Sequence, residues 1–393
     1  PNVVQLYSRV VREAGELFGA CHYSEYHFLV TCSDDLGYLG LEHLTSSLNG
    51  VYEHDLKDDA RRKGWVANLL PHEYVHSWCG KFRRPAGMCT RDFHTPEKTK
   101  LLWVYEGLAE YLGEVLMVRS GLVDLKEYRE MLALTISTLS HREGRRWRSL
   151  EDTAVASHLL RRGNPNWIDL RREQDYYFEG LLIWLEADAI IRACSQGKNS
   201  LDDFCRKFLG KNPSTAKVVP YELPDVMKVL RELADFDWEQ FLTVRVTQPQ
   251  EALPLDVVGR CGYRLQYATQ PSAYLTHHER DSITARDSLG LTFSGDGSIV
   301  NVIPGMIGDR AGLAPGMKVI GVNNKTFSRQ RLLDALADSV AARKIELLLI
   351  EGERFRTVVL NYADGPRYLE LVRDESKPDI LAEILKPRAN PPR

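Results

Sequence analysis

Apolar residues recur at helical spacing through most of the first 245 positions of the chain. Residues 2–19 carry an apolar residue every three or four positions and predict an amphipathic helix. Residues 26–32 are a short apolar run, closed by turn residues, and predict a buried strand. Longer helical segments are expected over 101–119, 124–140, 175–196, 200–209 and 222–244. The pattern indicates a mainly helical region with a small α/β part in front of it.

The pattern changes at residues 247–254, where a Pro-rich polar stretch marks a boundary. Short strand-like runs follow at 262–268, 288–293, 298–303, 317–322, 345–350 and 357–360. One helix is expected over 329–342. Several strands with one helix and Gly/Pro turns predict a small β-rich module of about one hundred residues.

These patterns divide the chain into five segments. Residues 1–60 are interpreted as the end of an N-terminal β region and the start of the next domain, and 61–250 as the mainly helical domain. Residues 251–275 are expected to be a linker, 276–365 the β-rich module, and 366–393 a C-terminal tail. The end of the tail, after Pro378, is expected to be frayed.

Composition excludes several classes of protein. Among 393 residues, 44% are hydrophobic and the formal net charge is -3, so wholesale disorder and nucleic-acid binding are not expected. No apolar run reaches the roughly 18 residues of a membrane span. Seven scattered cysteines without a Cys-x-x-Cys pair exclude a disulfide framework.

The first residue, Pro1, gives an expectation about the gene product. Because the chain does not begin with Met, we expect the sequence to start inside a longer protein. A signal peptide would be hidden by such a start, so the sequence predicts a soluble protein and leaves a cytoplasmic or periplasmic location open. The oligomeric state also stays open.

A metal-binding pattern provides the strongest chemical signal. His72-Glu73-Tyr74-Val75-His76 matches H-E-x-x-H. On a helix, residues four apart lie one turn above each other, so both imidazoles can reach one ion. Zinc suits neutral imidazole nitrogen, and Glu73 lies where it can take a proton from a water at the open position. Two histidines with structural roles on an ordinary helix are the alternative.

A third ligand must come from another part of the chain. The metzincin pattern requires glycine and histidine at positions where this chain has Cys79 and Phe82. The gluzincin pattern requires a glutamate on a second helix, and Glu106 and Glu110 share one helical face. One of them can bind the metal while the other holds a ligand histidine in place. Pro71 adds the expectation that the metal helix starts or kinks there.

Four segments occur in an order that indicates a family. They are Gly40-Leu-Glu-His43, His72 to Lys81, Trp103 to Leu108 and Tyr176-Tyr-Phe-Glu-Gly180. Over roughly residues 25–365, the chain resembles the PDZ-containing glycyl aminopeptidases, gluzincin metallopeptidases distantly similar to aminopeptidase N. The resemblance implies an α+β multidomain fold, with a mainly helical thermolysin-like (gluzincin) metallopeptidase domain followed by a β-rich PDZ domain. It also implies an N-terminal β domain upstream of these residues.

The resemblance implies a metal centre with one catalytic zinc ion. His72, His76 and Glu106 would be the ligands and Glu73 the general base. Glu110 would support a ligand histidine.

The resemblance also implies roles around the substrate. Tyr177 would stabilise the oxyanion, with Tyr176 as the alternative if the register is shifted by one residue. Glu42, together with Gly40, would bind the substrate, and the Glu42 carboxylate would hold the free α-amino group. Aromatic core packing for the tyrosines and a salt-bridging role for Glu42 are the structural alternatives.

Three departures from the family pattern affect what can be expected. Glu179 replaces the usual lysine of the Y-Y-x-K-G segment, and Cys79 replaces an asparagine. Tyr38 and Leu39 replace glycines, so a bulkier loop could reshape the site for the first residue of the substrate. These changes leave the glycine preference open.

The C-terminal module resembles a PDZ domain in two segments. Ser288-Leu-Gly-Leu291 is similar to the carboxylate-binding loop, and residues 309–324 are similar to the following strand region. The backbone near Leu289, Gly290 and Leu291 would then hold a C-terminal carboxylate while the peptide adds as a strand. A rigid spacer without peptide binding is the alternative.

These residues predict a zinc aminopeptidase that removes small N-terminal residues, Gly or Ala, from peptides. Two other functions stay open. One is a peptide-binding adaptor with a degenerate peptidase domain, and the other is an endopeptidase.

Overall fold

The computed structural model describes residues 2–161, 163–164, 166–210, 217–279 and 282–390. Helix α1 (Val3–Phe18) opens the chain, as the periodicity predicted. Asn2 and Gln5 form a reciprocal capping box at its first turn, an arrangement worth about 1 kcal/mol. At its other end, the Phe18 ring stacks on Trp78 with centroids 4.2 Å apart, which ties α1 to the metal-binding region.

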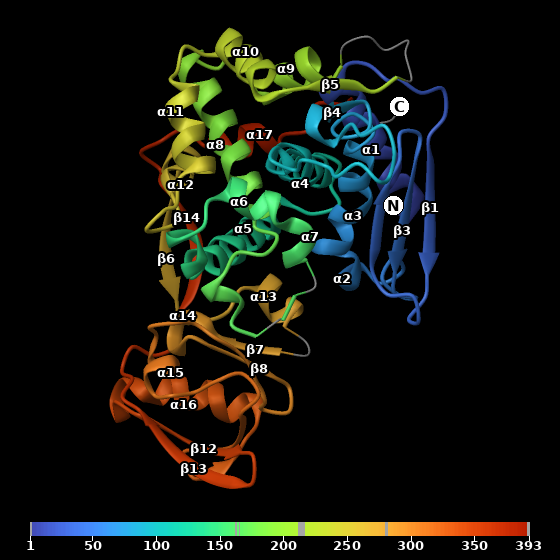
Figure 1. Cartoon of the computed structure of the whole chain (residues 1–393). Coiled ribbons are helices and arrows are strands. Elements are labelled where there is room, and N and C mark those ends of the chain that lie inside the picture. The colour runs from blue at the N-terminus through green and yellow to red at the C-terminus, as the bar shows by residue number, and fades with distance from the viewer. Residues whose placement is uncertain (1, 162, 165, 211–216, 280–281, 391–393) are drawn as a thin grey trace.

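A small sheet follows α1. Strands β1 (His27–Cys32), β2 (Leu39–Glu42) and β3 (Ser46–Val51) lie in the order β1-β3-β2, with β1 parallel and β2 antiparallel to β3. The prediction of a buried strand at 26–32 is wrong about burial, because Leu29 is 52% exposed. Figure 1 shows the reason, since helices lie on one side of this sheet only.

Four long helices form the centre of the molecule. They are α3 (Trp65–Val75), α4 (Leu102–Arg119), α5 (Leu125–Ser140) and α8 (Phe178–Cys194). Helix α3 continues through Pro71, so a helix start at that residue is wrong. None of the helices in the described part of the chain is long and apolar enough to cross a membrane.

Shorter elements surround the four long helices. They are α2 (Asp59–Arg62), β4 (Arg83–Pro85), α6 (Leu150–Val155), α7 (Ser157–Leu160), α9 (Leu201–Phe204), β5 (Val219–Tyr221), α10 (Leu223–Leu233) and α11 (Trp238–Leu242). Three single turns of 3-10 helix (Ala86–Met88, Glu143–Arg146 and Ile168–Leu170) and two π-helical turns (Cys205–Leu209 and Thr243–Thr247) complete the region. The helix expected over 222–244 is therefore interrupted between Leu233 and Trp238.

The segment expected to be a linker, residues 251–275, is instead part of the folded core. It forms α12 (Asp256–Arg260), β6 (Tyr263–Ala268) and the first half of α13 (Ala273–His278). Val257 and Tyr263 are buried in the same apolar cluster as the long helices. The linker prediction is wrong because these apolar side chains pack against the long helices and are buried there.

The segment expected to be a tail is also folded where the structure describes it. Strand β14 (Tyr368–Arg373) pairs antiparallel with β6, and α17 (Ile380–Leu385) buries Leu381 and Ile384 in the main core. A frayed end is therefore wrong for these residues; residues 391–393 lie outside the described part.

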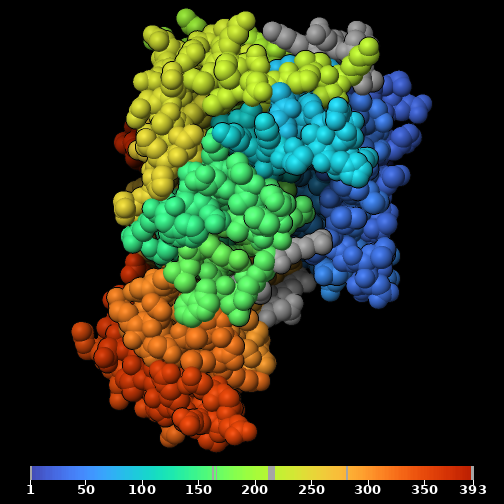
Figure 2. Space-filling model, viewed as in Figure 1, coloured from blue at the N-terminus to red at the C-terminus, as the bar shows by residue number. Residues whose placement is uncertain are grey.

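A second apolar cluster defines the C-terminal module. Its strands are β7 (Ser282–Ala285), β8 (Leu291–Ser294), β9 (Ile299–Val302), β10 (Lys318–Val322), β11 (Lys325–Thr326), β12 (Ile345–Glu351) and β13 (Arg354–Leu360). Its helices are α14 (Arg286–Leu289), α15 (Ile307–Arg310) and α16 (Arg329–Ala342), the last as predicted. They surround a core separate from that of the helical domain. Figure 2 shows the module projecting from one end of the molecule.

Candidate metal centre

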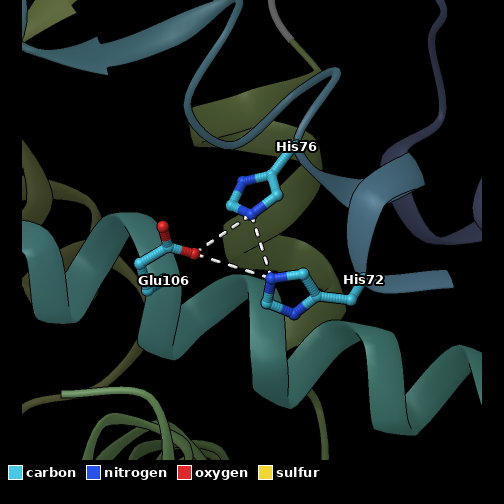
Figure 3. A group of neighbouring side chains, drawn as sticks. All are labelled: His72, His76 and Glu106. Carbon is cyan, nitrogen blue, oxygen red and sulfur yellow. Dashed lines mark hydrogen bonds and ion pairs between the residues drawn. The ribbon is translucent and has the colours of Figure 1, made fainter. Parts of the chain in front are cut away.

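Three side chains from two helices converge on one point. His72 and His76 lie one turn apart on α3, and Glu106 lies on the first turns of α4. His76 Nε2 is 3.0 Å from His72 Nε2 and 3.1 Å from Glu106 Oε2, and the third side of the triangle is 3.5 Å. Figure 3 shows both rings and the carboxylate turned toward the space between them.

The contacts of the two Nδ1 atoms explain why the Nε2 atoms of His72 and His76 face each other. His76 Nδ1 donates to the Cys79 carbonyl at 2.9 Å, and His72 Nδ1 lies 2.9 Å from Glu110 Oε2. A neutral imidazole carries one N–H, so both Nε2 atoms then point lone pairs inward. Two lone pairs at 3.0 Å repel unless a cation lies between them.

The donor triangle fits a zinc ion. A triangle with sides of 3.0, 3.1 and 3.5 Å has a circumradius of about 1.9 Å, and zinc bonds to nitrogen or oxygen are about 2.0–2.2 Å. The three atoms could therefore hold one zinc ion within bonding distance. Two imidazoles and one carboxylate are also a donor set that zinc accepts.

The electrostatics of the three groups also favour a cation. Burial lowers the pKa of His72, but the Glu106 and Glu110 carboxylates outweigh it and leave the pKa well above its usual range. Burial alone would raise the pKa of Glu106, yet the two histidines hold it far below its ordinary value. The cluster therefore requires positive charge at its centre, which protons or a metal ion can supply.

A buried hydrogen bond and an ion pair hold His72 from behind. Asn68 Nδ2 donates to Glu110 Oε1 at 2.9 Å, and the other Glu110 oxygen faces His72 Nδ1. Of the two glutamates proposed from the sequence, Glu106 is in the triangle and Glu110 is behind the histidine. The sequence argument missed Asn68, although it lies one helical turn before His72.

Glu73 lies beside the triangle under a glycine of the edge strand β2. A Cβ atom added to Gly40 would come within 1.9 Å of Glu73 Oε1, so only glycine leaves room for this carboxylate. Burial raises the pKa of Glu73, and the adjacent histidines partly oppose the rise. A buried carboxylate with a raised pKa is suited to accept and return a proton.

The two adjacent tyrosines have different surroundings. The Tyr177 ring lies 5.9 Å from the His72 ring, and its side chain lines a cavity that His72 and Glu73 also line. Tyr176 is only 3% exposed and is not among the residues lining that cavity. The structure therefore places Tyr177, and not Tyr176, on the wall of the cavity beside His72.

Glu42 lies on β2 near His76 and already has two partners. Its Oε1 atom accepts from the Tyr105 hydroxyl at 2.7 Å and lies 3.1 Å from Lys81 Nζ. The nearby cations hold the pKa of Glu42 at about 2 against the effect of burial. The sequence argument missed Tyr105 and Lys81, although Tyr105 immediately precedes Glu106. No hydrogen bond or ion pair within the described part of the chain involves the other carboxylate oxygen of Glu42, Oε2.

The departures from the family pattern lie away from the triangle. Glu179 is buried and pairs with two arginines, Arg145 at 2.8 Å and Arg172. The Cys79 thiol packs against the carbonyls of Val104 and Tyr105 at 3.5 and 3.6 Å. Both substitutions therefore affect how the protein interior packs around the site more than they affect the charge at the His72–His76–Glu106 triangle.

A cavity of about 600 Å³ opens beside the triangle. Gly40, Glu73 and Tyr177 line it near the metal centre, while Tyr274 and His278 of α13 line it elsewhere. Its volume falls in the range of about 300–1,000 Å³ typical of small-ligand sites.

The loop expected to bind a peptide carboxylate is buried. Leu289 and Leu291 are fully buried, and Gly290 packs against Met306. Strand β8 pairs with β7 on one edge and β9 on the other, so no edge of β8 is open for an added strand among the described residues. A peptide could add there only by displacing β7.

Residues 65–183, which include the metal triangle and Tyr177, match the M61 glycyl aminopeptidase family. This match covers less than half of the chain. No curated protein matches the sequence.

Solved structures provide a second comparison. An aminopeptidase N family protein from Idiomarina loihiensis is similar with a TM-score of 0.76 and 20% identity, over 98% of this chain and 66% of that one. An M1 zinc metallopeptidase from Deinococcus radiodurans has a TM-score of 0.40 and 18% identity, over 63% and 45% of the two chains. The chain therefore spans just under two thirds of the first structure and less than half of the second.

The family match is therefore confined to residues 65–183, and the similarity to the first structure shows a shared fold over 98% of this chain. All seven cysteines lie in the described part of the chain and are free, in agreement with the absence of a disulfide framework.

Proposed function

We propose that this protein is a zinc-dependent aminopeptidase. The observation that carries the proposal is the pair of histidine Nε2 atoms, 3.0 Å apart, that face a carboxylate oxygen. The family match at residues 65–183 supports the same function and a preference for a small first residue, Gly or Ala.

Each proposed residue has a role in hydrolysis. A bound zinc ion would lower the pKa of a water and polarise the substrate carbonyl. Glu73 takes a proton from the attacking water while the new C–O bond forms. Tyr177 donates a hydrogen bond to the carbonyl oxygen as it becomes negative. Glu73 then gives its proton to the amide nitrogen as the C–N bond breaks.

Glu42 would select substrates with a free N-terminus. Its open Oε2 atom would accept from the substrate's ammonium group, while Tyr105 and Lys81 hold Oε1. A carboxylate at this position distinguishes an aminopeptidase from an endopeptidase. A blocked N-terminus carries no ammonium group, so Glu42 Oε2 would be left without a charged partner.

We further propose that the C-terminal module has a PDZ fold and serves as a rigid support. The order of its strands and of α16 supports the fold, and the paired edges of β8 favour support over peptide capture.

Three measurements test the proposal. The purified chain should bind one zinc ion and hydrolyse alanine and glycine anilides, and Glu73→Gln should lower kcat by about 100- to 10,000-fold while keeping the zinc. Acetylation of the substrate should abolish turnover in the parent chain, and Glu42→Gln should lower kcat/KM for free peptides. Stoichiometric zinc without hydrolysis of any peptide would favour the adaptor, and equal cleavage of acetylated peptides would favour an endopeptidase.

A further inference from the structure

The cavity extends from the metal centre along helices α3 and α4. Near His72 and Glu73 it adjoins the metal triangle, and it continues past Leu69 to Trp65, almost two turns earlier on α3. On α4 it passes Glu110 and reaches Glu114, one turn later. The cavity therefore has a metal end and a far end.

Helix α13 lies at the far end. Tyr274 and His278 line the cavity there, with their rings stacked at 5.7 Å and an interplanar angle of 19°. Burial, together with the nearby Glu114 carboxylate, raises the pKa of Tyr274 to about 12. A Cβ added to Gly64 would lie 3.0 Å from the Tyr274 hydroxyl, so this hydroxyl lies at the start of α3.

Several contacts hold α13 in this position. The Tyr274 backbone N–H donates to Glu130 Oε2 of α5 at 2.9 Å, and Ser272 caps the helix through Leu275 N at 3.0 Å. The Tyr274 ring lies on Gly64, where an added Cβ would be 2.9 Å from the ring. Gly64 is the N-cap residue of α3, so α13 is tied to the helix that carries the histidines.

The edge strand β2 gives the direction of a bound peptide. Glu42 lies near His76, and Gly40 lies against Glu73 and lines the cavity. A substrate with its amino group at Glu42 therefore directs the residues after the scissile bond into the cavity, toward α13.

We propose that Tyr274 and His278 form a barrier that limits how many residues can follow the scissile bond. The substrates would then be short peptides of a few residues. A spherical cavity of about 600 Å³ is about 10 Å across, and extended chain advances about 3.3 Å per residue, which leaves room for about three residues. This inference rests on the proposed aminopeptidase function.

Peptide length is the variable that tests the barrier. With alanine peptides of two to eight residues and the full chain, kcat/KM should be at least tenfold lower for the octapeptide than for the tripeptide. Tyr274→Ala and His278→Ala should each raise kcat/KM for the octapeptide about tenfold relative to kcat/KM for the tripeptide. Tyr274→Phe keeps the ring and should keep the limit.

Matched controls are available close by. Tyr267→Ala removes a half-exposed ring of β6 that is covered by the Arg367 guanidinium. His277→Ala changes the residue next to His278. Neither residue lines the cavity, so both variants should keep the length dependence of the parent chain. Equal kcat/KM for all lengths in the parent chain, or equal effects of Tyr274→Ala on all lengths, would overturn the inference.

Binding separates this inference from the proposed function. In the Glu73→Gln background, calorimetry should give at least tenfold weaker binding for octa-alanine than for tri-alanine, and addition of His278→Ala should remove the difference. Failure of anilide hydrolysis with this binding pattern intact would contradict the aminopeptidase function alone. Hydrolysis with length-independent binding would contradict the barrier alone.

Discussion

Glu110 shows how much of the metal centre depends on a residue that would not touch the ion. Its carboxylate links the Asn68 amide to His72 Nδ1, and this fixes which His72 nitrogen points inward. Since metal sites lose affinity when the partners of their ligands are removed, Glu110 gives a direct test of this arrangement.

Glu110→Gln should weaken zinc binding by about 10- to 100-fold. The amide keeps the shape of the side chain but removes the charge that holds the His72 N–H. Competition with a chelator would measure the zinc affinity. Glu239→Gln, at an exposed position paired with Arg231 at 3.4 Å, is the control. A zinc affinity of Glu110→Gln within twofold of the parent chain would contradict the role of Glu110.

Glu179 is the second residue whose surroundings allow a sharp prediction. It is the only acidic partner within ion-pair distance of Arg145 in the described part of the chain, and it also pairs with Arg172. Introducing the lysine of the family pattern would place three cations together in a buried site.

Glu179→Lys should lower the free energy of unfolding by about 3–5 kcal/mol, because it leaves the buried Arg145 without its acidic partner and adds a third cation to the site. Urea unfolding followed by circular dichroism would measure the loss. Glu179→Gln keeps hydrogen-bonding capacity and should cost less. If Glu179→Lys is as stable as the parent chain, the pairing with Arg145 and Arg172 does not stabilise the fold.

At the scale of elements, the position of α4 against α8 brings Glu106 into the site. A Cβ added to Gly107 would lie 2.6 Å from the Gly180 Cα, so the two helices touch through their backbones. Gly107 directly follows Glu106, and Gly180 lies three residues after Tyr177. One crossing therefore sets the distance between a metal ligand and the proposed oxyanion donor.

Gly107→Ala should separate α4 from α8 and lower the free energy of unfolding by about 1–3 kcal/mol. The displacement of Glu106 should also weaken zinc binding. Thermal unfolding with and without zinc, together with chelator competition, measures both effects. Gly15→Ala is the control, since an added Cβ there meets no atom within 4 Å. Unchanged zinc affinity in Gly107→Ala would show that the crossing does not position the ligand.

The same elements show how far sequence reasoning extended. The spacing His72, His76 and Glu106 was readable because helical periodicity alone brings the first two together, and α4 was expected within a residue of its bounds. The roles of Lys81 and Tyr105 could not be read from the sequence, because they depend on how strand β2 packs against helix α3. The linker and tail expectations failed for a similar reason, since β6 and β14 pair across about one hundred residues of sequence.

At the scale of the whole molecule, polar contacts join the C-terminal module to the helical domain, and one group of them lies around Asp287. Asp287 of α14 accepts from Ser137 at 2.8 Å and lies 2.8 Å from His141 Nε2, both on or next to the end of α5. Beside it, Arg286 donates to Thr138 at 2.8 Å. Thr138 also lines the cavity, so the module supports a wall of the proposed substrate site.

Asp287→Ala should loosen this interface and lower the free energy of unfolding by about 1–3 kcal/mol, because it leaves Ser137 and His141 without their acceptor. Since Thr138 lines the cavity, KM for peptides should rise while zinc affinity stays the same. Urea unfolding, peptide kinetics and chelator competition measure the three quantities. Asp296→Ala removes an exposed acid of the same module, paired with Lys318 at 2.6 Å, and should change none of them. Equal effects of the two substitutions would mean that the module does not support the cavity through Asp287.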